Sequence, residues 1–464
     1  MTQSEAGVIV QLLARARGFA AKGRDEQAKA AYLELLRLDP AHFHALNELA
    51  TVALATGHRS AARTAYRQAV HCHPDNPVGR VNLGNIYFQD GDLAAARLQY
   101  EAALAADADF PEAHQGLART LDELGETAAA EPHWRQGFAG HALVVQRYRG
   151  TGSSVRVLLL VSSRFGNVST QLILDDRTFE VAALYADFYD PAQPLPLHAV
   201  VFNAIGDADL CPLALERAEA VLANTAAPVI NPPARVRRTG RSENARRLGA
   251  VPGVIAPAIR AVSRPALETA DDLRFPLLLR SPGYHMGSHF VRIERREDLP
   301  AAAAGLPGEE LLMIEYLDAR GTDGMARKYR VMIIDGNLYP LHLAISADWN
   351  VHYFRAAMAS EPAFREEEHR FLDAMPTVLG PLAMSALSGI AETLGLDYAG
   401  IDFGLSADGS VLLFEANTTM VIVPPPLDSM WNYRRAPIDR ALDAAKRMVL
   451  SRAAASVESS RFLR

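Results

Sequence analysis

The pattern of small, aromatic and polar positions repeats every 34 residues through the first third of the chain. The repeated positions form three columns, namely Ala28, Ala62, Ala96 and Ala130; Tyr32, Tyr66, Tyr100 and Trp134; and Ala16, Ala50, Gly84 and Ala118. Small residues at fixed helical positions let two antiparallel helices approach closely, and an aromatic residue then fills the gap to the next pair. Pro40 and Pro74 cannot continue a helix. The pattern therefore predicts four helix pairs over residues 1–140.

The hydrophobic pattern changes after a segment rich in Gly and Ser, residues 141–154, which is predicted to be a linker. Val155–Val161, His198–Phe202 and Ala220–Ala223 are short apolar runs, as expected of buried parallel strands. Val229–Asn231 is predicted to add an edge strand. Helical stretches separate these runs, so residues 155–235 are predicted to form an open α/β unit.

Alternating segments on both sides of Asp408-Gly409 predict a β-hairpin with a two-residue turn in which Ala407 lies opposite Ser410. In this register Asp402 lies opposite Glu415, and Asn417 shares their face. The other face is predicted to be core, and it holds Ile401, Phe403, Leu405, Leu412, Phe414 and Ala416.

Like charges directly opposite each other destabilise a sheet, so Asp402 and Glu415 call for a compensating cation. A divalent metal such as Mg²⁺, which prefers oxygen ligands and phosphates, would provide it. The alternative is an acidic face that is solvated or paired with arginine.

Composition narrows the class of protein. The chain has 464 residues, a net charge of −7 and only two cysteines, and a pI near 6.1. This balance gives no electrostatic case for binding nucleic acid or an anionic membrane. Arg15 and Arg17 interrupt the apolar N-terminal stretch, so no signal peptide is expected. Two distant cysteines suit a reducing compartment, and the cytoplasm is the expected location.

The 34-residue columns resemble the tetratricopeptide repeat. Ala108 stands where the third unit would have its proline, and the fourth unit becomes irregular after Gly137. The resemblance implies an all-α superhelix whose concave face binds a peptide or protein partner.

The rest of the chain, about residues 155–450, resembles the ATP-grasp superfamily. The resemblance divides it into an α/β pre-ATP-grasp domain (155–235), an α+β ATP-grasp domain (236–455) and a tail (456–464). In that superfamily an Asp on one strand and a Glu-x-Asn on the next hold the metals that bridge the ATP phosphates. The resemblance therefore implies that Asp402, Glu415 and Asn417 bind Mg²⁺ or Mn²⁺ together with ATP.

The same resemblance assigns further residues to the nucleotide. Arg280 ends a strand where the superfamily normally has Lys, and Gly283 to Gly287 resembles the flexible loop over the phosphates. Glu315 matches the hinge residue that seats adenine, with Tyr316 and Leu317 along the ring. Asp323 is assigned to the same nucleotide site.

Asp335-Gly336 predicts a second hairpin, which would place Lys328 and Arg330 on one face near the phosphates. The resemblance gives Arg330 the role of reaching the transferred phosphoryl group.

The expected function is an ATP-dependent ligase that activates a small-molecule or peptide carboxylate as an acyl phosphate for capture by an amine. Two alternatives stay open. One is a non-catalytic nucleotide-binding scaffold, which is consistent with the arginine in place of lysine at position 280. The other is an ATP-dependent phosphotransferase.

Overall fold

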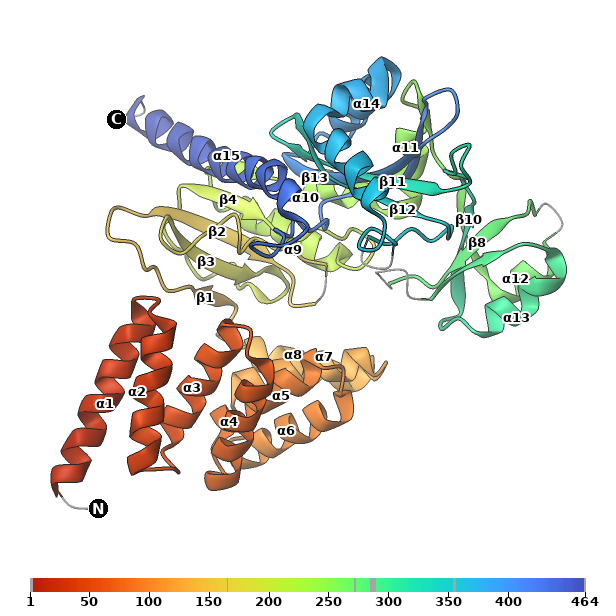
Figure 1. Cartoon of the computed structure of the whole chain (residues 1–464). Coiled ribbons are helices and arrows are strands. Elements are labelled where there is room, and N and C mark those ends of the chain that lie inside the picture. Colours follow the sequence, from red (N-terminus) through yellow and green to blue (C-terminus); the bar gives the residue numbers. More distant parts are fainter. Residues whose placement is uncertain (1–2, 165, 271–272, 284–288, 354–355, 463–464) are drawn as a thin grey trace. The chain divides into compact units, whose positions relative to one another are not determined.

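The computed structural model describes residues 3–164, 166–270, 273–283, 289–353 and 356–462 (Figure 1). The chain divides into two compact units. The first consists of Met1–Val144 with Arg149–Thr151, and the second of Val145–Tyr148 with Gly152–Arg464.

The first unit is a row of paired helices, coloured red to light orange in Figure 1. Its helices are α1 (Gln3–Ala21), α2 (Asp25–Leu38), α3 (Phe43–Ala55), α4 (Arg59–Cys72), α5 (Pro77–Gln89), α6 (Leu93–Ala106), α7 (Pro111–Glu123) and α8 (Thr127–Phe138). The predicted four helix pairs are confirmed. Pro40 and Pro74 follow the ends of α2 and α4, and α6 ends without a proline.

The three repeated columns form the interior of this array. The column alanines have no exposed surface, and the aromatic side chains are at most 4% exposed. Tyr100 shows why the small positions matter. A Cβ atom on Gly84 would lie 2.8 Å from its ring, and one on Gly116 would lie 2.3 Å from it. Two glycines therefore hold one aromatic ring between adjacent helices.

The second unit begins with a five-stranded sheet in the order β1-β3-β2-β4-β5. Its strands are β1 (Leu143–Val145), β2 (Val155–Val161), β3 (Phe179–Tyr185), β4 (Val200–Asn203) and β5 (Val229–Ile230). Neighbouring strands from β2 to β5 pair in parallel, as predicted. The predicted linker contains β1.

One strand prediction in this sheet is wrong. Ala220–Ala223 belongs to the end of helix α9 (Pro212–Leu222), and the missing strand is β3. The buried residues of α9 are Ala214, Leu215, Ala218 and Val221. Their spacing is helical, so the four-residue apolar run was the visible end of a longer amphipathic helix.

Two further sheets follow. A four-stranded antiparallel sheet has the order β7-β10-β8-β9, and a five-stranded sheet has the order β12-β11-β13-β14-β6. Their strands are β6 (Val254–Ile255), β7 (Ile259–Ser263), β8 (Leu277–Arg280), β9 (Phe290–Ile293), β10 (Glu310–Glu315), β11 (Ala326–Ile334), β12 (Asn337–Ser346), β13 (Tyr398–Leu405) and β14 (Val411–Asn417).

Helices cover these sheets. They are α10 (Pro233–Val236), α11 (Arg241–Leu248), α12 (Arg264–Thr269), α13 (Leu299–Ala304), α14 (Pro362–Leu394) and α15 (Arg435–Phe462), with short 3-10 turns η1 (Ala186–Phe188), η2 (Arg237–Thr239), η3 (Arg296–Asp298) and η4 (Asn432–Arg434). The segment from 456 was predicted to be a tail. In the described residues the backbone of this segment is helical and continues α15 to Phe462.

Among the described helices, α14 alone is long and apolar enough to cross a membrane. Its backbone leaves helical geometry at Ala374 and again at Gly380. Each straight piece is therefore shorter than the roughly 20 residues that a spanning helix needs.

The core of the second unit joins the first sheet to the third. Phe202 of β4, Tyr398 of β13, Met332 of β11 and Ile438 of α15 belong to one cluster of buried side chains. Asn231, which follows β5, accepts hydrogen bonds from the backbone nitrogens of residues 397 and 398, both at 2.9 Å. These contacts fix the carboxyl end of β5 beside the start of β13.

Candidate functional site

The hairpin between β13 and β14 holds the central acidic pair. Asp402 lies opposite Glu415, as predicted. The predicted pairing of Ala407 with Ser410 is wrong, because the backbone nitrogen of Ser406 donates to Ser410 at 3.0 Å and the loop therefore has three residues. Gly409 adopts a φ of 85°, which suits a turn that closes with a left-handed residue.

A bulge restores the register that the longer turn would have shifted. The pairing jumps between Asp402 and Phe403, because Phe403 lies opposite Leu413. Phe414 is the extra residue, so it leaves the core face on which it was predicted. A Cβ atom on Gly404 would lie 3.0 Å from the Phe414 ring, and that ring lines the cavity described below. Ile401, Phe403 and Ala416 are buried, as predicted. Leu412 is also buried, but it lies opposite Gly404 and therefore on the other face of the hairpin, and Leu405 is only partly buried.

Asp402 is buried beneath two cations of β11. Arg330 lies opposite it and donates to both carboxylate oxygens, at 2.6 and 2.7 Å. Lys328, two residues earlier on the same face, has its Nζ 3.4 Å from Oδ2. Burial raises the pKa of Asp402, but the charges of Arg330 and Lys328 outweigh burial and hold the pKa below its usual range.

Asp335-Gly336 makes the predicted two-residue turn between β11 and β12, since Ile334 pairs with Asn337 and both turn residues have positive φ. Lys328 and Arg330 are two residues apart on β11, so they lie on one face of the sheet, as expected.

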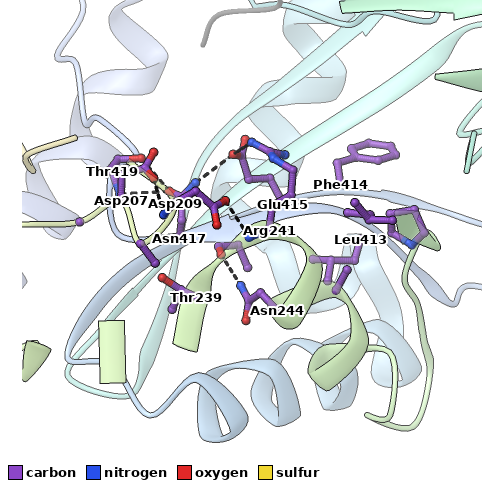
Figure 2. Close-up of a pocket in the computed structure, with 16 residues that line it drawn as sticks. Asp207, Asp209, Thr239, Arg241, Asn244, Leu413, Phe414, Glu415, Asn417 and Thr419 are labelled. Carbon is purple, nitrogen blue, oxygen red and sulfur yellow. Dashed lines mark hydrogen bonds and ion pairs between the residues drawn. The ribbon is translucent and has the colours of Figure 1, made fainter. Parts of the chain in front are cut away.

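Glu415 meets a cation that the sequence did not point to. Figure 2 shows Arg241, at the start of α11, and Glu415 of β14 pointing toward each other, with 2.6 Å between Nη2 and Oε1. Oε1 also accepts a hydrogen bond from the Asn417 amide at 3.0 Å. Asn417 Oδ1 accepts from the backbone nitrogen of Thr419 at 3.0 Å. Burial raises the pKa of Glu415, but the charges of Arg241 and Arg280 and the hydrogen bond from Arg241 together outweigh burial, so the pKa is lowered.

Both carboxylates are thus paired with arginine, which is the alternative that the sequence left open. Within the described residues there is no group of three or more His, Cys, Asp or Glu side chains placed to hold a metal. The predicted ligand set has two carboxylates and one amide. In the described part of the chain no side chain or backbone donor reaches Glu415 Oε2, which belongs to a residue of the cavity wall.

Arg280 ends β8 and enters the same region. Its guanidinium carbon lies 5.5 Å from the centre of the Phe290 ring, and burial with the nearby charge of Arg241 lowers the pKa of Arg280 to about 10. It stays protonated at neutral pH. Gly283 has a φ of 81° and follows closely after β8. Gly287 and the rest of the predicted loop, residues 284–288, lie outside the described residues.

Glu315 is the last residue of β10. Its carboxylate accepts a hydrogen bond from the backbone nitrogen of Ala258 at 3.0 Å, so the side chain braces the segment before β7. The Tyr316 ring lies 4.2 Å from the guanidinium carbon of Arg292. Glu315, Tyr316 and Leu317 all line one cavity, which is described below.

Asp323 is placed elsewhere. It forms an ion pair with Arg327, with 2.8 Å between Nη2 and Oδ2, and it is not among the described residues that line the cavity. Arg327 also pairs with Glu367 at 2.6 Å. Because side chains alternate along β11, Arg327 faces away from Lys328, and its position removes Asp323 from the site.

One cavity of about 720 Å³ connects these residues. Apolar side chains from β7, β8, β10 and β14 line one part, namely Ile259, Leu278, Ile314, Leu413 and Phe414. Four cations face the two carboxylates in the middle, namely Arg241, Arg280, Lys328 and Arg330. The third part contains His342, Tyr353 and Arg434, together with Val351 and Ile438.

Sequence reasoning missed Arg241 and assigned no role to Arg434. Arg241 lies 174 positions before its partner Glu415. Its only local signal is its place at the start of a helix, directly after Gly240. Arg434 stands in a short 3-10 turn before α15, and nothing in its surrounding sequence distinguishes it from an exposed arginine.

The comparisons with known proteins address the first unit. A family model described as "Tetratricopeptide repeat" matches residues 13–77 and 81–136. Together with the eight helices, this match identifies the first unit as a tetratricopeptide-repeat array. The α/β region has no family assignment. No curated protein matches the chain.

Solved structures similar to the chain also align over about a quarter of its length. MamA from Desulfovibrio magneticus RS-1 is 21% identical, with 28% of this chain and 74% of that chain covered and a TM-score of 0.26. A tetratricopeptide repeat protein from Parabacteroides merdae ATCC 43184 is 20% identical, with 29% and 54% covered and a TM-score of 0.27. The first repeat domain of Spaghetti (RPAP3), bound to the HSP90 peptide SRMEEVD, is 18% identical, with 25% and 93% covered and a TM-score of 0.24.

Proposed function

We propose that the second unit is an ATP-grasp ligase, which uses ATP and Mg²⁺ to join a carboxylate to an amine. The observation that carries the proposal is the cluster of Asp402, Glu415 and four cationic side chains within one cavity that is apolar at its neighbouring end. An adenine ring suits the apolar end, and a polyphosphate suits the cationic middle.

The cationic middle matches the needs of phosphoryl transfer. Catalysis of this reaction depends chiefly on positioning the phosphates and compensating their charge. Arg330 and Arg280 present planar groups that can grip phosphate oxygens in two-pronged fashion. Arg280 in place of lysine retains the charge, because its pKa stays near 10.

The carboxylates fit a magnesium ion in their chemistry. Mg²⁺ is commonly bound by one or two carboxylates together with substrate phosphates. Asp402 and Glu415 lie side by side in register, and Oε2 of Glu415 takes no hydrogen bond from the described residues. Asn417 turns its amide nitrogen toward Glu415, so its oxygen can join the set only after the amide rotates about its last torsion. A bound magnesium ion would neutralise phosphate charge and orient the terminal phosphate.

The arginine pairs give these side chains a second role. Arg330 and Arg241 compensate the charges of the two carboxylates. A metal would take over that compensation, so the guanidinium groups would become available to phosphate oxygens. In this way the same cations would serve first the carboxylates and then the phosphates.

The proposed chemistry has two steps. A carboxylate oxygen of the substrate attacks the terminal phosphorus of ATP, the bond from that phosphorus to the bridging oxygen breaks, and ADP leaves with the electron pair. An amine then attacks the acyl carbon, phosphate leaves with the former carboxylate oxygen, and the ammonium proton passes to solvent. The protein contributes the charge compensation of Arg330 and Arg280 to the first step.

Calorimetric titration of ATP with Mg²⁺ into the wild type and Glu415→Gln tests the proposal. We expect metal-dependent binding by the wild type and its loss in Glu415→Gln. Glu310→Gln, which changes an exposed carboxylate of β10, is the matched control and should bind normally. Absence of binding to the wild type, or equal binding by Glu415→Gln, would overturn the nucleotide site.

The two alternatives predict different products. In ³¹P NMR with mixtures of carboxylates and amines, a ligase releases free phosphate only when both substrates are present. A phosphotransferase instead yields a stable phosphorylated compound. A nucleotide-binding scaffold binds ATP and produces neither.

We propose that the repeat array binds a peptide or protein partner, which is the usual use of such arrays. The polar side chains of Asn47 and Asn82 bind each other within the array, since the Asn82 amide donates to Asn47 at 2.8 Å. His114 is also buried, beside His133. A partner would therefore contact other positions of the array.

A further inference from the structure

Arg434 is a buried cation in the third part of the cavity, beyond the carboxylate pair. It is 9% exposed and belongs to η4, between β14 and α15. Its guanidinium carbon lies 4.3 Å from the centre of the Tyr353 ring. The charged group nearest to it in the described chain is Glu368, with 3.4 Å between Nε and Oε1.

The hydrogen-bonding capacity of Arg434 is not used by the described residues. Its Nε is buried without an acceptor, and none of the hydrogen bonds found in the described chain begins at its guanidinium. Glu368 is already committed, because its Oε2 accepts from the hydroxyl groups of Tyr353 and Tyr433 and its Oε1 accepts from the Leu343 backbone. Buried donors are almost always satisfied, and a guanidinium has five of them. An acceptor from outside the chain is therefore expected here.

Contacts connect Arg434 to the phosphate side of the site. His342 of β12 lies opposite Arg330 in the sheet, and its ring centre is 4.8 Å from that of Tyr353. Tyr353 in turn lies against Arg434. A molecule that reaches from Arg330 to Arg434 would thus extend past the side chains of His342 and Tyr353. The group that binds Arg434 is therefore separate from the group that reacts near Arg330.

The wall beside Arg434 is apolar. Ile438 stands one helical turn after it, and Val351 precedes Tyr353 by two residues. Both are buried, and Val421 and Val423 of the β14–α15 connection add to the lining. A phosphate ion alone would gain nothing from these side chains, whereas an organic carboxylate with an apolar body would bury that body against them.

We propose that Arg434 binds a recognition carboxylate of the substrate, and that the adjacent valine and isoleucine side chains bind its apolar body. The substrate class is then a small amphipathic carboxylate, such as an apolar amino acid, whose reacting group points toward Arg330. This inference rests on the proposed function, which supplies the reaction, but binding of the carboxylate can be measured without nucleotide.

The experiment compares 4-methylpentanoate with 4-methylpentanamide, which has the same carbon skeleton without the charge. Binding is measured by ligand-observed NMR on the full chain, with and without Mg²⁺ and ADP. We expect the wild type to bind the carboxylate at least tenfold more tightly than the amide, because charge-assisted hydrogen bonds to a guanidinium are the strong ones. Inorganic phosphate, tested as a competitor, should displace the carboxylate weakly.

Two variants and one control locate the site. Arg434→Gln should lose the preference for the carboxylate, and Arg440→Gln, at an exposed arginine of α15, should keep it. Val423→Glu places a negative charge, the same sign as that of the probe, in the wall of the cavity. The side chain at this position is 52% exposed, so the variant does not have to bury a charge. Val423→Glu should also lose the preference for the carboxylate over the amide. It therefore tests the inference even if Arg434→Gln does not fold.

Equal binding of the two probes by the wild type would overturn the inference, as would a preference that survives in Arg434→Gln or in Val423→Glu. Displacement of the probe by phosphate at equal concentration would assign Arg434 to phosphate instead. Calorimetry with ATP and Mg²⁺ keeps the two proposals apart. Arg434→Gln should bind the nucleotide as the wild type does. If the wild type binds the carboxylate but no nucleotide, the inference about Arg434 stands and the proposed ligase function is wrong.

Discussion

Gly116 of α7 tests how tightly the repeat array is packed. A Cβ atom at this position would lie 2.3, 2.5 and 2.7 Å from three atoms of the Tyr100 ring. The ring cannot retreat, because Gly84 on its other side already comes within 2.8 Å by the same measure. The Tyr100 hydroxyl also donates to Asn85 at 2.8 Å, so a displaced ring would lose that hydrogen bond.

Two opposing effects set the magnitude for Gly116→Ala. Overpacking costs about 1–3 kcal/mol, and loss of one hydrogen bond costs about 1 kcal/mol. Replacing a helical glycine by alanine recovers about 1 kcal/mol of helix propensity. We expect the free energy of local unfolding to fall by about 1–3 kcal/mol.

Gly18→Ala in α1 is the matched control, since nothing lies within 4 Å of its added Cβ. Only the propensity term applies there, so we expect a gain of about 0.5–1 kcal/mol.

Hydrogen exchange of peptides from α5, α6 and α7 in the full chain measures the effect where it occurs. Exchange in Gly116→Ala should accelerate about tenfold for each 1.4 kcal/mol lost, while the α1 peptides of Gly18→Ala should exchange more slowly than in the wild type. If Gly116→Ala protects its helices as well as the wild type does, the ring has room to move and the reasoning about the column positions fails.

Three further outcomes are expected. Asp402→Asn leaves Arg330 without its carboxylate, so urea unfolding should show a loss on the order of 3 kcal/mol, and calorimetry should show no metal-dependent ATP binding; a stable variant that still binds would contradict the assigned role. Burial raises the pKa of Glu368 above its ordinary 4.5, so its contribution to stability is full below that value and is lost as pH rises through the folded pKa. Urea unfolding between pH 4 and pH 8 should show this decline in the wild type but not in Glu368→Gln, and parallel profiles would refute it. Deleting residues 1–140 should raise the KM of a peptide substrate and leave ATP binding unchanged, and an unchanged KM would end the case for substrate recognition by the repeats.

The repeat array could be predicted from the sequence because its contacts are local and periodic. Each column position packs against a neighbour about one helix away, so the same residue types recur at the same spacing. Buried Tyr32, Tyr66 and Tyr100 stand where the 34-residue alignment placed them.

Whether a strand was predicted correctly depended on the length and the apolar pattern of its segment. Six of the seven residues Val155–Val161 are apolar, and this run identified β2. Strand β3, in which Glu180 is the only charged residue, was missed, and its two central alanines are poor strand formers. The end of α9 was misread because Ala220–Ala223 are all apolar, as in a short buried strand. Short apolar runs do not separate strand from helix without their tertiary neighbours.

The pairing of Asp402 with Glu415 was predicted correctly, although the turn between their strands differs from the predicted one. Asp402 meets Glu415 because a longer loop and a bulge at Phe414 compensate each other. The alternation of side chains decided which residues share a face. The turn residues alone did not decide how many of them would form the loop.

The sequence by itself determined the repeat array, the Asp335-Gly336 hairpin and the pairing of Asp402 with Glu415, because each depends on residues close in the chain. Only the tertiary structure decided which cations serve the acidic pair. Arg241 reaches Glu415 from 174 residues away, Arg327 draws Asp323 out of the site, and Arg434 enters the cavity without using its donors on the described residues. The direction of a long charged side chain depends on which opposite charge lies nearest in space, and that distance exists only after the sheets and helices have packed.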